Sequence, residues 1–402
     1  MPKLCNFYEI ELFFLLKSRK ICFENLLYEE KSLILELVKF TNIERTVHCT
    51  SNKFTLYMNI LVVRFRQMGD AILATSLLNT LRRNFPEAQI HFVLNEKIAP
   101  LFQGHPSIDR IITFDEEERH HLVHYLKRVW QIVHDTHYDV IIDMRSTANT
   151  MLFARLSPHT DYRIGVKKRY TRLAFNHLIP PCGNKSMVEH DVNFASPLNA
   201  IKPIDPVTDF TLHITDEERQ TFGAYLQEQG LDLNKPIMLA NVTAKLASKV
   251  WNEERMVWVL NQFIRHFPNF QIIFNYAPGQ EEENARRVYQ KLGNPPQVFI
   301  DVQARSSRQL VAMGHYMTLF FGNEGGARHI MHAAGCPSFV VCAPGNSKTV
   351  WLPQNSVPAV GISPTDFATS AELANMSKEQ QYELISQEKV WEQLKTFTEK
   401  TL

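Results

Sequence analysis

Three short stretches of the chain combine residue types that can carry chemistry. The first, GNEGGARHIMHAAGCP, starts at Gly322 and directly follows an apolar run, so it is expected to join a buried strand to a helix. Gly325 and Gly326 lack side chains, which lets a bulky anion approach the free backbone N–H groups at the helix start. Glu324 can accept hydrogen bonds from sugar or ribose hydroxyls, and His329 can donate to a phosphate. A structural Gly–Gly turn beside a packed histidine is the alternative, and this stretch alone leaves both open.

The second stretch, RFRQMGDAIL at 64–73, also joins an expected strand to a helix. Ligands bind at such carboxyl ends of strands in open α/β sheets. Asp70, after Gly69, can act as a general base that takes the proton of an attacking hydroxyl. It can equally be a plain N-cap that accepts backbone hydrogen bonds. The spacing does not choose between the two.

The third stretch, KLASKVWNEERM at 245–256, lies between an expected strand and helix. Lys249 can stabilise the negative charge that develops on a diphosphate leaving group. The alternative is an exposed lysine beside a half-buried Trp251.

A further stretch, RIGVKKRYTR at 163–172, holds basic residues and a tyrosine but no acid. It is either a solvated loop or a surface that contacts anionic lipid headgroups or a negatively charged acceptor, at roughly 1 kcal/mol per basic residue. The candidate contacts are Lys167, Lys168, Arg169 and Arg172.

Familiar phosphate and metal motifs are absent from the sequence. There is no G-x-x-x-x-G-K-[ST] and no G-x-G-x-x-G after a strand, which argues against kinase, ATPase and NAD-dependent activities. No H-E-x-x-H or carboxylate cluster indicates a metal. The histidines at 120, 121, 124 and 134 are expected on a solvated helix face.

Composition places the chain among soluble globular proteins. Its 402 residues suffice for two domains, with 45% hydrophobic and 21% charged residues. The formal net charge of +1 gives no global field for nucleic acid. The six cysteines form no C-x-x-C, which predicts free thiols in a reducing compartment. No apolar run can cross a bilayer, and Glu9 and Glu11 interrupt what would be a signal-peptide core. We therefore expect a cytoplasmic protein.

Apolar runs alternate with amphipathic stretches from residue 58 onward. Strands are expected at 60–65, 89–94, 110–115, 138–145, 237–242, 271–276, 297–301, 317–322 and 338–344, with helices between them, one of them over 116–136. This alternation predicts parallel βαβ units. Residues 201–215 hold two prolines, Pro203 and Pro206, and are expected to link two doubly wound α/β domains that face a cleft.

Four segments follow from this organisation: residues 1–57, a first doubly wound domain at 58–205, a second at 206–378, and a C-terminal helix at 379–402 that packs back on the N-terminal domain. Residues 1–57 differ in composition from the rest. Two interpretations stand for them: translation starts at Met58, or they form a helical extension.

Together these residues resemble glycosyltransferase family 9, the ADP-heptose:lipopolysaccharide heptosyltransferases. ILVVRFRQMGDAILATSLLNTLRRNFPEAQIHFVL is similar to the family's opening strand, Gly-Asp turn and helix. KVW at 249–251 resembles its Lys-x-Trp, and GNEGGARHIMHAAGCP with PGNSKTVWLP resembles its most specific motif. YDVIIDMRSTANTMLFARL and YRIGVKKRYTRLAFN are similar to its mid-domain segments. The resemblance covers residues 58–353.

The resemblance implies a GT-B fold, with two Rossmann-like domains and inverting sugar transfer without metal or cofactor. The donor, on the domain at 206–378, would be a nucleotide sugar, ADP-heptose. The acceptor, on the domain at 58–205, would be a lipopolysaccharide core or lipid-linked sugar at the inner membrane face. Asp70 would be the base and Lys249 would hold the diphosphate. The remaining donor contacts would be Thr243, Ser248, Glu324, Gly325, Gly326 and His329, with Glu281 or Glu282 near the nucleoside.

Two positions depart from the family pattern. Glu324 stands where Asp is common, and Gly325 stands where a hydroxyl residue is common. Both changes bear on which sugar is bound. Two alternatives on the same scaffold are a non-catalytic sugar-nucleotide-binding protein and a nucleotide-sugar epimerase.

Overall fold

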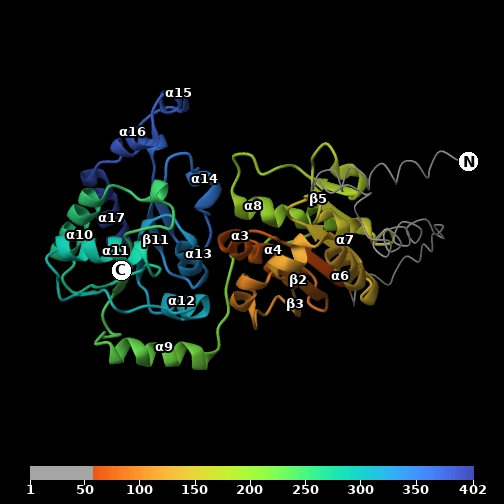
Figure 1. Ribbon diagram of the computed structural model, residues 1–402, viewed down its shortest axis with the longest axis horizontal. Helices are drawn as coiled ribbons and strands as arrows, with labels where there is room; N and C mark the ends of the chain where they lie inside the picture. The colour runs from red at the N-terminus through yellow and green to blue at the C-terminus, as the bar shows by residue number, and fades with distance from the viewer. Residues whose placement is uncertain (1–57) are drawn as a thin grey trace, which may run out of the picture.

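The computed structural model describes residues 58–402, and it divides into two halves, each built around a six-stranded parallel sheet (Figure 1). The predicted start at Met58 and the proposed helical extension both concern residues 1–57, which lie outside the described residues. Helices cover both faces of each sheet, as expected for doubly wound α/β domains.

The N-terminal sheet has the strand order β3-β2-β1-β4-β5-β6. Its strands are β1 (Asn59–Val63), β2 (Gln89–Asn95), β3 (Arg110–Phe114), β4 (Val140–Asp143), β5 (Tyr162–Val166) and β6 (His177–Ile179). Alternate side chains of β1 enter different cores. Ile60 and Val62 pack under the helices α4 (Thr75–Asn84) and α8 (Met187–Val192). Leu61 and Val63 pack under α6 (Leu122–Asp135) and α7 (Met151–Arg155). Apolar residues on both faces are what buries a parallel strand.

Short helices connect these strands. They are α3 (Met68–Leu73), α4 (Thr75–Asn84), η2 (Glu96–Phe102), α5 (Glu116–His120), α6 (Leu122–Asp135), α7 (Met151–Arg155), η3 (Thr171–Leu173), α8 (Met187–Val192) and η4 (Asn193–Ala200). The single helix expected over 116–136 is two helices, because His121 has an extended backbone between them. The four histidines of that region are exposed, as expected.

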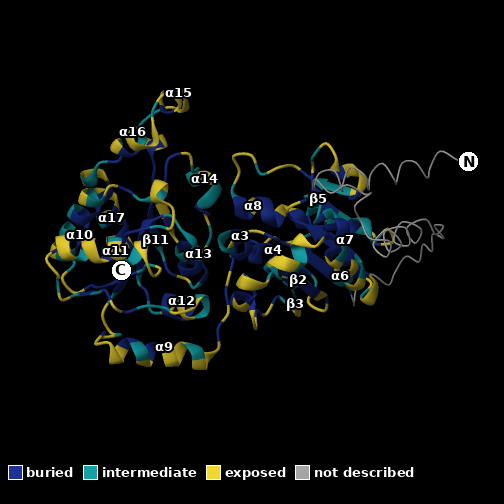
Figure 2. Ribbon diagram, viewed as in Figure 1, coloured by how far each residue is buried: buried dark blue, intermediate teal, exposed yellow. Residues whose placement is uncertain are grey.

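The C-terminal sheet has the order β12-β11-β10-β7-β8-β9. Its strands are β7 (Ile237–Asn241), β8 (Gln271–Phe274), β9 (Val298–Phe299), β10 (Leu319–Asn323), β11 (Ser338–Val341) and β12 (Ala359–Ile362). Its helices are α9 (Asp216–Glu228), η5 (Ala247–Lys249), α10 (Glu253–His266), α11 (Gln280–Lys291), α12 (Ser307–Gly314), α13 (Gly326–Ala333), α14 (Lys348–Trp351), η6 (Pro364–Asp366), α15 (Ser370–Ala374), α16 (Lys378–Glu383) and α17 (Gln387–Thr401). The strands are buried, whereas α9 leaves its outer face exposed (Figure 2).

All the strands predicted from the sequence are present. Three further strands, β5, β6 and β12, were not predicted. β5 begins the basic stretch at 163–172, so part of that stretch is a strand and not a loop. β6 has only three residues, which is too short for an apolar pattern to be detected. In β12 the apolar pattern is short and is interrupted by Gly361.

The predicted linker and the predicted tail have different outcomes. Residues 201–215 contain no helix or strand, as expected of a linker. The expectation that the C-terminal helix packs back on the N-terminal domain was wrong. α17 packs against α10 and β11 of its own domain, because its apolar residues Val390, Leu394 and Phe397 complete that core (Figure 1).

Gly322 is required where β10 passes β7. Its φ is +136°, and an added Cβ would lie 2.3 Å from the carbonyl oxygen of Asn241. We expect Gly322→Ala to lower the free energy of unfolding by about 2–4 kcal/mol, from steric overlap and backbone strain together. The measurement is urea unfolding followed by circular dichroism.

Gly293→Ala is the matched control. Gly293 also has a positive φ, +83°, but no atom lies within 4 Å of an added Cβ. It is expected to cost only about 1 kcal/mol. Equal losses for the two variants would contradict the close approach of the strands at Gly322.

Candidate active site

A cavity of about 430 Å³ lies between the two halves, at the carboxyl ends of β1, β7 and β10. Six of the residues selected from the sequence line it. These are Asp70, Lys249, Glu324, Gly325, Gly326 and His329. They come from both domains and from three separate stretches of sequence, so the fold brings together groups that the sequence could only suggest individually.

Asp70 is the third residue of α3, and its side chain is nearly buried. Gln67 is the N-cap of that helix, so the plain N-cap interpretation of Asp70 is wrong. Two arginines hold its carboxylate instead: Arg66 Nη1 at 2.9 Å and Arg64 Nη2 at 3.5 Å from Oδ1. Arg64 is itself buried and lies 3.5 Å from the buried carboxylate of Asp191. The ion pairs therefore fix the direction of Asp70.

A second cavity, of about 610 Å³, opens on the other side of Asp70 within the N-terminal domain. Its lining includes Arg66, Lys97, Arg119 and Arg145. Asp70 lines both cavities, as do Gln67 and Met68. A group bound in the second cavity can thus meet a ligand of the first at the Asp70 carboxylate.

Buried asparagines fix the strand ends that carry the cavity loops. Asn241 Nδ2 donates to the carbonyl of Asn323 at 2.9 Å, and Asn323 Nδ2 donates to the carbonyl of Asn241 at 3.1 Å. Asn323 Oδ1 also accepts from the backbone N–H of Trp251 at 2.8 Å. Trp251 is fully buried, whereas the alternative interpretation of this stretch had a half-buried tryptophan. The Lys249 loop is therefore tied to the strand that precedes Glu324.

The start of α13 presents backbone and charge to the cavity. Its N-cap is Gly325 and its first residue is Gly326, so neither position carries a side chain at the helix N-terminus. Glu324 Oε2 lies 4.0 Å from Lys249 Nζ and accepts a hydrogen bond from Asn346 Nδ2. Lysine and the helix start together offer an anion site, while Glu324 can accept hydrogen bonds from hydroxyl groups.

The two domains meet where α3 contacts α13. An added Cβ on Gly69 would lie 2.9 Å from His329 Cδ2, and one on Gly326 would lie 2.6 Å from Met68 Cε. Both glycines therefore permit the two helices to approach. This contact places the Asp70 turn directly opposite the start of α13.

Burial lowers the pKa of each ionisable group on the inner side of α13. Desolvation, reinforced by the neighbouring Arg328, holds the pKa of His329 well below its usual value. Desolvation lowers the pKa of His332 to about 4 and that of the Arg328 guanidinium to about 10. Both imidazoles are therefore neutral at pH 7.

Other predicted residues lie outside this cavity. Thr243 follows β7 with a buried hydroxyl that has no hydrogen-bond partner, Ser248 is exposed, and Glu281 lies in the first turn of α11. Lys245, Arg328 and Asn346 are among the cavity residues that were not selected from the sequence. All three lie in stretches that the sequence singled out, but their spacing alone did not distinguish them from ordinary helix and loop residues.

The basic stretch is divided by the fold. Lys168 Nζ donates to the carbonyls of Arg145 and Ser146 at 2.7 and 2.8 Å, and burial lowers its pKa. Lys168 is thus turned into the protein. Lys167, Arg169 and Arg172 are exposed.

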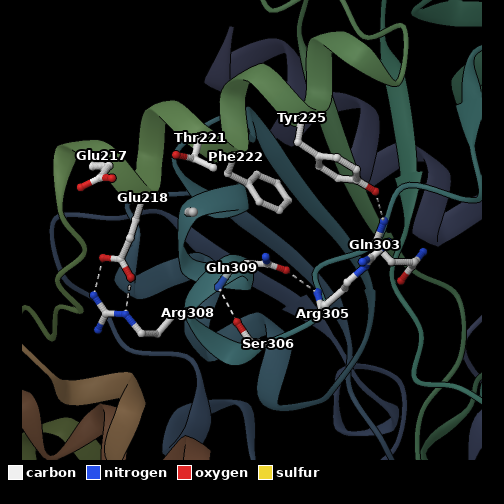
Figure 3. Close-up of a pocket in the computed structure, with 11 residues that line it drawn as sticks. Glu217, Glu218, Thr221, Phe222, Tyr225, Gln303, Arg305, Ser306, Arg308 and Gln309 are labelled. Atoms are coloured by element: carbon white, nitrogen blue, oxygen red, sulfur yellow. Dashed lines mark hydrogen bonds and ion pairs between the residues drawn. The ribbon is translucent and has the colours of Figure 1, made fainter.

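A third cavity, of about 540 Å³, lies between α9 and α12 (Figure 3). At one end Arg308 forms a two-point ion pair with Glu218 and donates to the carbonyls of Pro100 and Gln103 in the N-terminal domain. The hydrogen bonds from Arg308 lower the pKa of Glu218 to about 2. Arg308 therefore links α12 to the opposite domain, away from the Asp70 cavity.

Residues 58–402 contain neither a membrane-spanning helix nor a cluster of metal-binding side chains. None of their helices is both long and apolar enough to cross a membrane. No group of three or more His, Cys, Asp or Glu side chains within the same range is arranged to hold a metal ion.

Two parallel six-stranded domains with facing carboxyl ends and a shared cavity define the GT-B class of glycosyltransferase. The chain belongs to glycosyltransferase family 9 (heptosyltransferase), whose family model matches residues 126–382. It is accordingly a glycosyltransferase, which sets aside the binding-protein and epimerase alternatives.

Similar proteins agree with this assignment. The chain is 20% identical to lipopolysaccharide heptosyltransferase 1 of Campylobacter coli, over 71% of this chain and 83% of that protein. A family 9 glycosyltransferase from Veillonella parvula is similar in fold, with a TM-score of 0.72 and 19% identity over 86% of this chain and 98% of that one. The E. coli heptosyltransferase WaaC, solved with ADP-2-deoxy-2-fluoro heptose, is also similar in fold, with a TM-score of 0.63. Its sequence is 16% identical over 84% of this chain and 99% of that one.

The low pKa of His332 predicts acid sensitivity. The unfolded chain binds a proton near pH 6.5, but the folded protein resists it until about pH 4. The contribution of His332 to the free energy of unfolding is therefore fully present above pH 6.5. It falls as the pH drops from 6.5 toward 4, by up to about 1.4 kcal/mol per pH unit. We expect His332→Gln to flatten the slope, measured by urea unfolding at several pH values in that window.

His121→Gln, which replaces an exposed histidine, is the control and is expected to keep the wild-type slope. An unchanged slope in His332→Gln would mean that His332 does not resist protonation in the folded state.

Proposed function

We propose that this glycosyltransferase inverts the anomeric centre, requires no metal, and transfers a heptose from ADP-heptose to a lipopolysaccharide core acceptor. The observation that carries the proposal is the position of Asp70, which lines both the interdomain cavity and the cavity of the N-terminal domain. The donor would occupy the first cavity and the acceptor the second, with the carboxylate where they meet.

The donor assignment is supported by charge and by relatives. The backbone at Gly325 and Gly326, which carry no side chains, suits a nucleoside diphosphate together with Lys249. The Campylobacter coli relative is a lipopolysaccharide heptosyltransferase, and WaaC was solved with an ADP-heptose analogue. Glu324, held beside Asn346, would accept hydrogen bonds from hydroxyls of the transferred sugar.

The reaction would be a single displacement. Asp70 takes the proton of the acceptor hydroxyl as its oxygen forms a bond to C1 of the donor sugar. The bond between C1 and the diphosphate oxygen breaks, and the diphosphate leaves toward Lys249 and the α13 start. Attack opposite the leaving group inverts C1. The lysine and helix N-terminus would stabilise the departing charge without a metal.

The domain roles follow the same logic. Residues 58–205 would bind the acceptor and residues 206–378 the nucleotide sugar, with 379–402 as a C-terminal segment of the donor domain. Thr243 and Ser248 would assist on the loop of Lys249. Glu281, in the first turn of α11, would face the nucleoside.

A membrane contact forms a separate part of the proposal. Tyr170 and Leu173 have exposed fractions of 49% and 58%, and they lie among the exposed Lys167, Arg169 and Arg172. Exposed apolar side chains within a basic patch suit an anionic membrane surface, because the apolar side chains enter the interface while the charges meet headgroups. This would place the enzyme peripherally at the inner membrane, beside a lipid-linked acceptor.

The first test is transfer itself. We expect the purified enzyme to add one heptose from ADP-heptose to heptose-deficient lipopolysaccharide, measured by mass spectrometry, with equal rates in buffer and in excess EDTA. Asp70→Asn should lower the rate roughly 10²- to 10⁴-fold, since it removes the base, while ADP still binds.

Four results would contradict parts of this proposal. Loss of activity in EDTA would overturn metal independence. Full activity in Asp70→Asn would remove its role as base. Transfer from UDP-, GDP- or dTDP-sugars, but not from ADP-heptose, would overturn the donor assignment. Retention of the donor's anomeric configuration, read by NMR of the product, would overturn inversion.

The membrane contact has its own prediction. Replacing Tyr170 and Leu173 together by Ser should weaken binding to vesicles that contain phosphatidylglycerol by roughly tenfold, because two inserted apolar side chains are lost. Co-sedimentation measures this. Val360→Ser, at an exposed apolar position in β12, is the control. Equal binding by both variants would exclude this patch as the contact.

A further inference from the structure

Arg328 is a buried cation that the proposed reaction has not used. It lies in the first turn of α13 and has an exposed fraction of 3%. It lines the interdomain cavity together with Lys249 and the two glycines of the helix start. Within residues 58–402 it forms no ion pair with a carboxylate; its partners there are neutral.

The hydrogen bonds of the Arg328 guanidinium are incomplete. Nη2 donates to the carbonyl of Trp351 at 2.8 Å and lies 2.9 Å from Nδ1 of His329. Nη1 is buried and has no hydrogen-bond partner. A buried charge without counter-ion or complete hydrogen bonds is costly, so folded proteins retain one mainly where something else compensates it.

The charges around the cavity leave an excess of positive charge. Lys245, Lys249 and Arg328 supply cations, whereas Asp70 and Glu324 supply anions. Asp70 is already held by two arginines of its own domain. Glu324 therefore faces the three cations, and this excess of positive charge favours an anionic ligand.

We infer that Arg328 binds the diphosphate of the nucleotide-sugar donor, as a second cationic contact beside Lys249. Its position on the first turn of α13 places it next to the helix N-terminus, where phosphate oxygens are expected. Gly325 contributes no side-chain donor there, and the unpartnered Nη1 supplies one. The inference rests on the proposed function, since it assumes that a nucleoside diphosphate occupies this cavity.

The test compares ligands with and without phosphate. ADP and adenosine are titrated by isothermal calorimetry into wild type, Arg328→Met and Arg328→Lys. Arg328→Met should weaken ADP binding roughly 10- to 100-fold, as expected for loss of a charge-assisted hydrogen bond, and leave adenosine binding unchanged. Arg328→Lys should lie between, because it keeps the charge but loses the planar fork.

Two controls separate binding from folding. Arg305→Met removes an exposed arginine at the α9–α12 cavity and should leave ADP binding at the wild-type value (Figure 3). The melting temperature of ligand-free Arg328→Met should equal or exceed that of wild type, because an uncompensated buried charge is replaced by an apolar side chain. A clear drop in melting temperature with ADP affinity retained would assign Arg328 a structural role instead.

The remaining outcomes distinguish this inference from the proposal on which it rests. Wild-type ADP affinity in Arg328→Met overturns only the role of Arg328. Equal loss of ADP and adenosine binding overturns the diphosphate contact. If wild type binds none of ADP, UDP, GDP and dTDP, both the nucleotide-sugar assignment and the Arg328 contact fail together.

Discussion

The reciprocal hydrogen bonds between Asn241 and Asn323 are the constraint on which the cavity depends. They join the carboxyl ends of β7 and β10, and the close approach they require admits only glycine at position 322. Asn323 also holds the backbone of Trp251, so the Lys249 loop and the Glu324 turn share one anchor. Lys249 and Glu324 can then lie 4.0 Å apart without a strong direct interaction between them.

The second constraint is the approach of α3 to α13. Gly69 and Gly326 remove the side chains that would separate the helices, and His329 fills the space against Gly69. Because each helix directly follows the central strand of its own sheet, this single contact brings the two carboxyl edges together. The Arg308 link to Pro100 and Gln103 supports the same domain arrangement from another surface.

The sequence was most informative where local pattern determines structure. Apolar runs located the long strands, and turns that follow such runs located Asp70, Lys249 and Glu324, since ligand sites in α/β sheets lie at those ends. Contacts between residues far apart along the chain could not be predicted from the sequence. Lys168 turns inward to carbonyls more than twenty positions away, and Arg328 loses its solvent only when α14 covers it. The strands β6 and β12 were too short to give a periodic apolar pattern. The spacing of apolar residues in α17 shows that one face is buried but not which domain that face packs against.

The charges of the two domains are satisfied differently, and this asymmetry is informative. Asp191, Arg64 and Asp70 form a nearly buried chain whose first two members are 127 positions apart, and each charge has an opposite partner. Removing one member of such a chain costs about 3–5 kcal/mol, so the Asp70 carboxylate is held rigidly before any ligand arrives. Arg328, across the cavity, is equally buried but has no carboxylate partner in the part of the chain that the structure describes. The carboxylate of Asp70, the proposed base, is thus fixed by its arginine partners before a substrate binds. The charge of Arg328 lacks such a partner, and the anionic substrate would supply it.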